Sequence, residues 1–334
     1  PILWQPLSGA LDGIKRVYYA PDGLLHRVNF DAIPINNQHY LSDVVELVRL
    51  NSSRTLVDQP TLSPLINPRA ALFGDVKYDL DTANSGALAP LPYGQAGTGQ
   101  DQGLTPEEAI GRWPVLPGTQ KEIALIEEVL SECKIVVRDF SGQEASEFNL
   151  KNLGQKQTAP GILHLATHGF FERRQDTLIE VSSSNNDKSV WGQVDDPMFR
   201  SGIVLAGANS AWLNKRAFDR EEEDGVVTAY EISQLNFSNT ELVVLSACET
   251  GLGDVFRNEG VYGLQRAFKV AGAKNLIISL WKVPDNETSE FMLEFYRLWI
   301  KEKHTIHAAF YQAQKFMRGR YKDPNKWAGF ILVQ

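Results

Sequence analysis

One stretch decides the fold of this chain: Thr240-Glu241-Leu242-Val243-Val244-Leu245-Ser246-Ala247-Cys248. Its centre is a continuous apolar run, which is typical of a strand that is buried on both faces of a parallel sheet. A second stretch, Gly161-Ile162-Leu163-His164-Leu165-Ala166-Thr167-His168-Gly169, has the same character. We therefore expect two central strands, each of which ends in a reactive side chain.

Further strands alternate with amphipathic helices on both sides of these stretches. The strands are expected at 70–74, 133–137, 274–280 and 327–333, and the helices at 118–130, 144–153, 260–271, 287–301 and 304–319. This alternation predicts an α/β fold, a three-layer sandwich with a mainly parallel central sheet and helices on both faces. In such sheets the active site lies beyond the carboxyl ends of the strands.

The first part of the chain has a different pattern. Residues 16–20 and 24–30 predict two strands joined by the turn Pro21-Asp22-Gly23, which together form a β-hairpin. Residues 41–48 are compatible with either a helix or a strand. We expect residues 1–68 to form a smaller N-terminal segment that packs on an α/β core of residues 69–334.

Two polar segments interrupt the core. Residues 81–112 are rich in Gly, Pro and Gln and predict a mobile loop. Residues 172–224 form an insert that is polar and charged, which predicts a solvated loop. Because this insert leaves the sheet directly after His168, it could cover or gate a site there.

The composition restricts the partners. The net charge is −8 and no basic run occurs, so direct binding of nucleic acid is not expected. No stretch approaches the roughly 18 apolar residues that a membrane span needs. The two cysteines, Cys133 and Cys248, fit a reducing compartment, and we expect a cytoplasmic location. Pro1 is not an initiator residue, so we expect the chain to be cut from a longer protein.

The two reactive side chains, His168 and Cys248, suit thiol chemistry. Adjacent parallel strands lie about 5 Å apart, so both side chains would meet at one edge of the sheet. An imidazole beside a thiol raises the thiolate fraction or accepts the proton during attack. The backbone N–H groups of Gly169 and Cys248 would form the oxyanion hole. Either residue alone is more often structural, but their combination predicts a cysteine endopeptidase that forms a thioester with its substrate.

Metal and cofactor sites are not expected. His164 and His168 have the i, i+4 spacing of a zinc-binding helix, but they lie in a strand and no glutamate stands between them. We expect His164 to be a hydrogen-bonded core residue that supports the site. Gly97-Thr98-Gly99-Gln100 and Gly251-Leu252-Gly253 lack the residues of a P-loop and the full spacing of a dinucleotide fingerprint.

Several motifs together resemble the CHAT domain, a family related to caspases and separases in clan CD. They are His164-Leu165-Ala166-Thr167-His168-Gly169, Leu245-Ser246-Ala247-Cys248-Glu249-Thr250-Gly251, Gly260-Val261-Tyr262-Gly263-Leu264 and Ser279-Leu280-Trp281-Lys282-Val283-Pro284-Asp285. The resemblance implies a caspase-like cysteine peptidase, typically bacterial, often joined to tetratricopeptide repeats and active in antiviral or cell-death responses. It assigns the dyad to His168 and Cys248 and leaves the third catalytic residue unassigned.

The resemblance also implies where a substrate binds. In caspase-like enzymes the segment after the strand at 274–280 pairs with the substrate as an added strand, so Leu280 and Trp281 are candidate contacts. Separases carry an acidic residue in the similar segment to hold a basic P1 side chain. Asp285 could do the same, or it could cap the helix that follows.

Ser246 and Glu249, on either side of Cys248, complete the candidate substrate-binding set. The expected substrate is a protein, with a tetratricopeptide or other regulatory module as a possible partner. The main alternative is a catalytically silent caspase-like module for interaction or regulation. A different thiol hydrolase or an acyltransferase on the same dyad is a third possibility.

Overall fold

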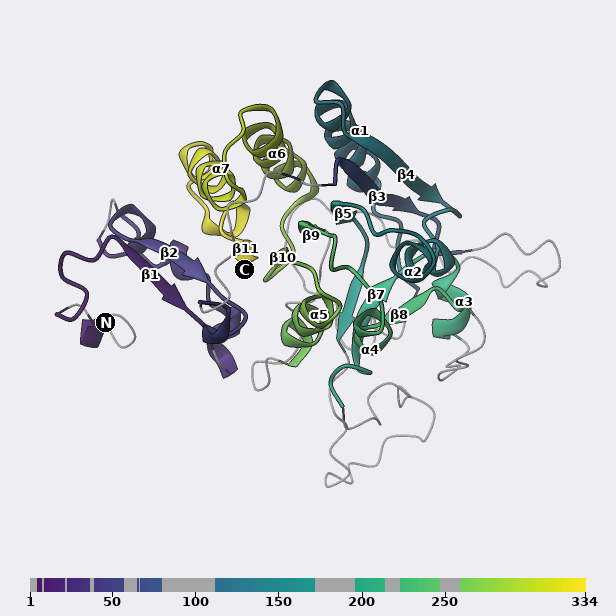
Figure 1. The fold of residues 1–334 in the computed structure, drawn as a ribbon, viewed down its shortest axis with the longest axis horizontal. Helices are drawn as coiled ribbons and strands as arrows, with labels where there is room; N and C mark the ends of the chain where they lie inside the picture. The colour runs from purple at the N-terminus through teal and green to yellow at the C-terminus, as the bar shows by residue number, and fades with distance from the viewer. Residues whose placement is uncertain are drawn as a thin grey trace, which may run out of the picture.

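A six-stranded sheet forms the centre of the protein (Figure 1). The structure is a computed structural model that describes residues 5–7, 9–21, 23–36, 39–56, 65, 67–79, 112–171, 196–213, 223–246 and 259–334. The strand order is β11 (Phe330–Val333), β10 (Asn275–Ser279), β9 (Leu242–Leu245), β5 (Ile162–Leu165), β3 (Arg69–Val76) and β4 (Val136–Gly142). Every neighbouring pair is parallel except β10 with β11. The expected mainly parallel sheet is therefore confirmed.

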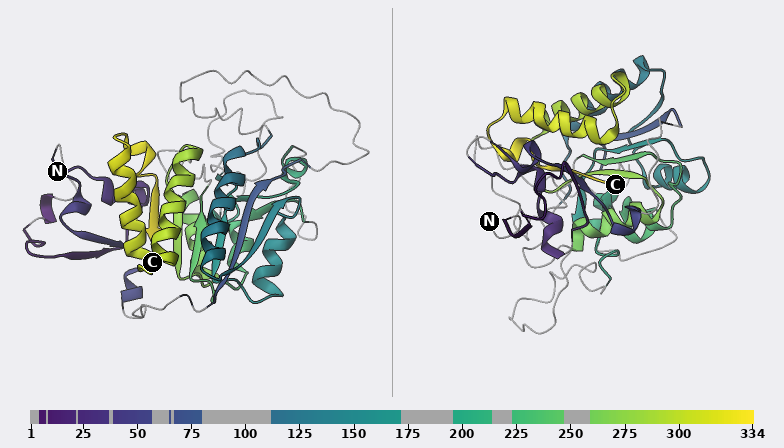
Figure 2. Two further views of the ribbon diagram at one scale, coloured as in Figure 1. Left: turned by 90° about the horizontal axis from the view of Figure 1, so that it is seen from above. Right: turned by 60° about the vertical axis from the view of Figure 1, so that its left-hand side comes forward.

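Helices cover both faces of this sheet (Figure 2). One face carries α1 (Pro117–Glu132), α6 (Asp285–Tyr296) and α7 (Ile306–Arg320), and the other carries α2 (Glu147–Gln155), α4 (Ala229–Ser233) and α5 (Glu259–Val270). Along each strand the side chains alternate between the two cores: Leu72 packs against the first set of helices and Phe73 against the second. The fold is thus the expected three-layer sandwich. None of the helices in the described ranges is both long and apolar enough to span a bilayer.

Directly after His168 the chain enters a second, small antiparallel sheet. It consists of β6 (Gly169–Phe171), β7 (Ser201–Val204) and β8 (Val226–Thr228), with α3 (Ala208–Leu213) after β7. The prediction of a solvated loop is wrong for this part of the insert 172–224, because Ile203 and Val204 are fully buried. Residues 172–195 and 214–222 of the insert lie outside the described residues, as does the predicted mobile loop 81–112 except for Arg112.

The predicted N-terminal hairpin is wrong. β1 (Arg16–Tyr19) pairs in parallel with β2 (Glu46–Arg49), and Gly23–Arg27 forms a 3-10 helix instead of a second strand. The reason is non-local: the carbonyl of His26 accepts a hydrogen bond from Nη2 of buried Arg49 at 2.8 Å, which holds this turn against β2. The ambiguous residues 41–48 divide into a 3-10 turn, Leu41–Asp43, and the start of β2.

Long-range polar contacts hold the N-terminal segment on the core, beside α7 and β11 (Figure 1). Asn29 Nδ2 donates to the carbonyls of Ala328 and Phe330 at 2.8 and 3.2 Å. Arg318 of α7 pairs with Asp43 at 2.6 Å. The boundary at residue 68 stays a prediction.

Replacing Asn29 tests this attachment. In Asn29→Ala the carbonyl of Ala328 loses the Asn29 donor, and that of Phe330 keeps only Gln314 Nε2 at 3.5 Å. The free energy of unfolding should therefore fall by about 1–3 kcal/mol in chemical denaturation. Asn325→Ala is the matched control, because that side chain is exposed and its effect should stay within about 0.5 kcal/mol. Equal losses in the two variants would contradict a specific role for Asn29.

Glu147 of α2 forms a hydrogen bond that connects this helix to the small sheet. Its Oε2 accepts a hydrogen bond from the N–H of Gly225 at 2.9 Å, just before β8, and Lys151 pairs with its Oε1. Gly225 has φ of 80°, and a Cβ there would lie 2.6 Å from the carbonyl oxygen of Ala206. Burial raises the pKa of Glu147 to about 7, against an ordinary value of 4.5, although Lys151 opposes the shift.

The raised pKa of Glu147 predicts a pH-dependent stability. The folded state favours the neutral carboxyl, so its contribution is complete below about pH 4.5 and is lost as the pH rises through about 7. Glu147→Gln is neutral at every pH, so its free energy of unfolding relative to the parent should rise across this window. Urea denaturation on both sides of the window measures this difference, and a constant difference would contradict the assignment.

Candidate active site

The register between β5 and β9 fixes where the site lies. Leu165 pairs with Leu245, and the N–H of Ser246 donates to the carbonyl of Leu165 at 3.2 Å. The chain therefore leaves both strands at the same edge of the sheet, as expected, and His168 and Ser246 line one pocket. Cys248 and Glu249 lie outside the described residues, so the predicted nucleophile has no described geometry.

A backbone carbonyl orients the imidazole of His168. Nε2 lies 2.8 Å from the carbonyl oxygen of Pro114, and a carbonyl can only accept, so Nε2 carries the hydrogen. In the neutral ring Nδ1 is then the nitrogen that can take up a proton. The rings of Tyr78 and Trp113 each have their centroid 5.2 Å from that of His168. The base candidate is thus held in one tautomer and packed between two aromatic side chains.

The residue before His168 is held as firmly. Thr167 Oγ1 donates to the carbonyl of Val204, and it lies 2.9 Å from the phenol oxygen of Tyr78, which therefore donates to it. Burial raises the pKa of Tyr78 to about 12, so the phenol remains protonated. The N–H of Val204 in turn donates to the carbonyl of His168 at 2.9 Å. Gly169, the candidate oxyanion donor, opens β6 directly after this anchored peptide.

His164 belongs to the core, as expected. Its Nε2 lies 3.0 Å from Oε1 of Glu122 and its Nδ1 lies 3.2 Å from the phenol oxygen of Tyr296. All three side chains are buried. Glu122 projects from α1 and Tyr296 from α6, so His164 links the sheet to both helices through its two ring nitrogens.

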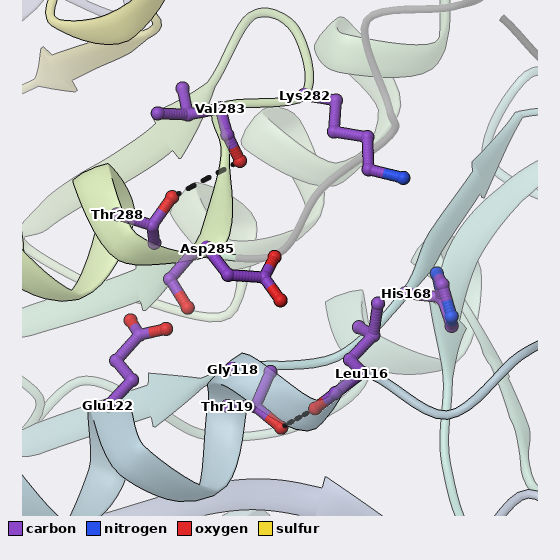
Figure 3. A pocket seen from close by; sticks show the side chains of 10 residues that line it. Leu116, Gly118, Thr119, Glu122, His168, Lys282, Val283, Asp285 and Thr288 are labelled. Carbon is purple, nitrogen blue, oxygen red and sulfur yellow. Dashed lines mark hydrogen bonds between the residues drawn. The ribbon is translucent and has the colours of Figure 1, made fainter. Parts of the chain in front are cut away.

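The pocket beside His168 lies between the start of α1, the end of β9 and the segment before α6 (Figure 3). The space within it, open solvent included, is about 430 Å³. The lining residues are Leu116, Gly118, Thr119, Glu122, His168, Ser246, Lys282, Val283, Asp285 and Thr288. The lining of the pocket is therefore mixed, with apolar walls and a few polar groups, as is usual for ligand-binding sites.

Asp285 faces this pocket and does not cap its helix. α6 begins at Asp285 with Pro284 as the N-cap residue and with no side-chain cap, so the predicted alternative role as an N-cap is wrong. Its carboxylate points toward His168 (Figure 3). Gly118 lies against it so closely that an added Cβ would be 2.4 Å from Cβ of Asp285.

The two other described candidates for substrate contact lie apart from the pocket lining. Leu280 is 4% exposed, packs in the core and donates its N–H to the carbonyl of Gly329 at 2.7 Å. Trp281 is half-buried, and its Nε1 donates to the carbonyl of Asn325 at 3.1 Å. Of the predicted substrate-binding residues, Ser246 and Asp285 thus meet beside His168, and Leu280 and Trp281 do not.

Two groups of the site were missed by the sequence analysis. Pro114 acts through its carbonyl, for which the sequence holds no side-chain signal. Glu122 does carry a signal, because it is an acidic residue on the apolar face of α1 that also holds Ile126 and Val129. Such a charge on a buried face requires a partner, and His164 supplies it.

The motifs around His168 and in the segment after β10 occur in one family. The CHAT domain matches residues 1–334. The chain belongs to the CHAT domain family. Two relatives are tetratricopeptide repeat protein 28 of Mus musculus, 32% identical over 225 residues, and its Homo sapiens counterpart, 32% identical over 232 residues. Each comparison covers 66% of this CHAT domain but only 9% and 8% of the relatives' length.

Solved structures show the same fold as this CHAT domain. The Arg-specific cysteine proteinase gingipain R aligns with a TM-score of 0.53 at 12% identity, over 98% of this chain and 66% of that chain. The complex of the pro- and mature domains of the Porphyromonas gingivalis enzyme gives a TM-score of 0.53 at 13% identity, with the same coverage. The architecture is therefore that of caspase-like cysteine proteinases.

The orientation of His168 can be tested directly. If the carbonyl of Pro114 accepts a hydrogen bond from Nε2, long-range ¹H–¹⁵N spectra should show the neutral imidazole of His168 as the Nε2–H tautomer. His168→Ala provides the assignment. The Nδ1–H tautomer would contradict this account of the base.

Proposed function

We propose that this CHAT domain is a cysteine endopeptidase with Cys248 as the nucleophile and His168 as its base. The observation that carries the proposal is the β5–β9 register, which brings His168 and Ser246 to one pocket. Cys248 follows Ser246 by two residues. A histidine with an oriented imidazole after one strand, and a cysteine that follows the neighbouring strand in the sequence, are the residues that thiol catalysis needs.

The chemistry balances with these groups. His168 takes the thiol proton at Nδ1 as the sulfur of Cys248 attacks the carbonyl carbon of the scissile bond. The N–H groups of Gly169 and Cys248 donate to the resulting oxyanion. When the C–N bond breaks, the imidazolium gives the proton to the leaving amine and a thioester remains. Water, deprotonated by His168, then attacks the thioester and releases the acid and the thiol.

The tautomer of His168 supports this sequence of proton transfers. Pro114 accepts from Nε2 in both the neutral and the charged ring, so the ring need not turn between the two steps. We therefore assign Pro114 the part of the third partner, which orients the base through its carbonyl. Tyr78 and Trp113 restrict the ring further by packing against it.

The substrate side chain that precedes the scissile bond would occupy the pocket lined by Ser246 and Asp285. Trp281 and Glu249 remain proposed flanking contacts. Leu280 could contribute only through its carbonyl, because its side chain packs in the core and its N–H donates to Gly329. An extended substrate running along the segment after β10 would pair with that backbone.

Regulation by a tetratricopeptide module is part of the proposal. It is supported by the two relatives, which are tetratricopeptide repeat proteins far longer than this chain. A role in bacterial defence or cell death rests on the family resemblance, and a cytoplasmic location rests on the two cysteines of the sequence.

Substitution of the dyad tests the peptidase function. Cys248→Ala and His168→Ala should each reduce peptide hydrolysis by at least about 10³-fold, because a dyad fails when either member is lost. Cys133→Ala is the matched control, since it removes the partly exposed free cysteine and should leave hydrolysis unchanged. Circular dichroism should show that the three variants remain folded.

Labelling by an electrophilic peptide distinguishes a peptidase from a catalytically silent interaction module. A peptidyl acyloxymethyl ketone should modify Cys248 and spare Cys133, as read by intact-mass spectrometry with peptide mapping. Absence of Cys248 labelling, even with a tetratricopeptide module present, would favour a catalytically silent interaction module.

A further inference from the structure

The carbonyl of Pro114, which holds the imidazole of His168, belongs to a segment that is largely exposed. Pro114 and the following Val115 both face solvent. The ion pair between Arg112 and Asp79, at 3.8 Å, joins two side chains that are more than half exposed, so it contributes little to the position of this segment. A carbonyl in such a segment stays beside the imidazole only if other contacts hold its backbone.

Asn209 of α3 holds the residue before Pro114 by both of its backbone polar groups. Oδ1 of Asn209 accepts a hydrogen bond from the N–H of Trp113 at 2.7 Å, and Nδ2 donates to the carbonyl of Trp113 at 3.2 Å. The same Nδ2 donates to Oδ2 of Asp79 at 3.1 Å. Because the N–H of Trp113 can only donate and its carbonyl can only accept, these contacts fix the orientation of the Asn209 amide.

The amide of Asn209 is shielded from solvent and reaches both aromatic neighbours of the imidazole. Only 1% of the residue is exposed, so water does not compete for its hydrogen bonds. The backbone N–H of Asn209 donates to the carbonyl of Tyr78 at 3.1 Å. Tyr78 and Trp113 are the residues whose rings pack against His168. Asn209 therefore joins the two segments that flank the base.

The proline ring makes the contact of Asn209 with Trp113 effective at a distance. The carbonyl of Trp113 lies in the planar peptide that ends at the nitrogen of Pro114. The ring of Pro114 restricts its φ to about −65°. Only ψ of Pro114 is then a soft torsion between the amide of Asn209 and the carbonyl that meets His168. A side chain that holds the carbonyl of Trp113 thus restricts the carbonyl of Pro114 as well.

α3 also supports this segment through packing. The ring of Trp212 meets that of Trp113 edge-on, with the centroids 4.9 Å apart, and it meets Phe170 of β6 in the same way at 5.3 Å. Asn209 and Trp212 are three residues apart, so they lie on the same face of the helix. This face of α3 therefore contacts Trp113 through one polar and one aromatic side chain.

We propose that Asn209 is a positioning residue for the base. It holds the Trp113–Pro114 peptide, so that the carbonyl of Pro114 keeps the imidazole of His168 in the Nε2–H tautomer. The inference rests on the proposed peptidase function and adds a residue that acts through the backbone of Trp113. Without the amide, the carbonyl of Pro114 moves relative to the imidazole, and Nδ1 is no longer always the nitrogen that can accept the thiol proton.

Two substitutions at position 209 test the effect on turnover. Asn209→Ala removes the amide, whereas Asn209→Asp fills the same space and keeps an acceptor for the N–H of Trp113 but, when ionised, has no donor for its carbonyl. In peptide hydrolysis kcat should fall by about 10- to 100-fold, because small displacements of a catalytic group have effects of this size. KM should stay nearly the same, since Thr119 separately anchors the part of the segment that lines the pocket.

The imidazole itself supplies a measurement that a loss of stability alone would not change. In long-range ¹H–¹⁵N spectra, the neutral imidazole of His168 should be a mixture of the Nε2–H and Nδ1–H tautomers in the Asn209 variants, instead of Nε2–H alone. Asn209→Asp should fold even if Asn209→Ala does not, because it leaves no cavity and the exposed Asp79 can turn into solvent.

Asn275→Ala is the matched control. Asn275 is also buried, and its Nδ2 donates to the carbonyl of Glu241 at 2.9 Å, at the amino end of β10 and thus at the opposite edge of the sheet from His168. This variant should be destabilised but should keep the parental kcat and tautomer. The proposal would be overturned by an equal fall of kcat in Asn275→Ala, or by folded Asn209 variants that keep the single Nε2–H tautomer, whatever their kcat.

Failure of the peptidase function would give a different result. If the parent chain hydrolyses no peptide, the proposed function fails, but the spectra need neither a substrate nor a reactive thiol and still test Asn209. A tautomer mixture in the Asn209 variants would support the positioning of His168. If the mixture left kcat unchanged, His168 would not be the base, although Asn209 would still position it. A mixture in the parent chain itself would overturn the inference.

Discussion

The parallel pairing of β5 with β9 is the interaction on which the rest of the structure depends. Its register, Leu165 opposite Leu245, puts His168 and Ser246 at one edge of the sheet. A slip of one residue in β5 would turn every side chain of that strand to the opposite face. His164 would then leave Glu122 and Tyr296, which lie on the side of α1 and α6, and a buried carboxylate would lose its partner. Polar as well as apolar contacts therefore specify this register.

The strands of the central sheet other than the exposed edge strand β4 could be predicted from the sequence because they are buried on both faces. Such strands are short, continuous apolar runs, and their length distinguishes them from the longer amphipathic helices around them. The N-terminal segment has no comparable signal. Residues 24–30 mix apolar and polar side chains, and their conformation depends on Arg49, Ala328 and Phe330, which are distant in the sequence. Local patterns favour a hairpin there, whereas these long-range hydrogen bonds stabilise a 3-10 turn.

The candidate site likewise contains residues that the sequence pattern predicts and others that only the tertiary structure brings together. His168 could be predicted because it ends a buried strand, and the position of a strand end follows from the apolar pattern. The carbonyl of Pro114 could not, since any residue presents a carbonyl and only the tertiary structure brings this one to the imidazole. For Asp285 the sequence allowed two roles. The helix begins one position too early for Asp285 to be its cap, and that single position leaves the carboxylate facing the pocket.

The start of α1 connects the orientation of His168 with the lining of the pocket. Residues just before the helix, Trp113 and Pro114, hold the imidazole of His168, and Glu122 in its second turn supplies the floor of the pocket. Thr119 fixes this segment to the sheet, because its Oγ1 accepts a hydrogen bond from the N–H of Asp75 at 2.9 Å and donates to the carbonyl of Leu116 at 2.8 Å. Since one rigid element carries both functions, a displacement of the start of α1 would alter the base and the pocket together. Residues 113–122 of this CHAT domain therefore link the orientation of the His168 imidazole to the lining of the pocket beside it.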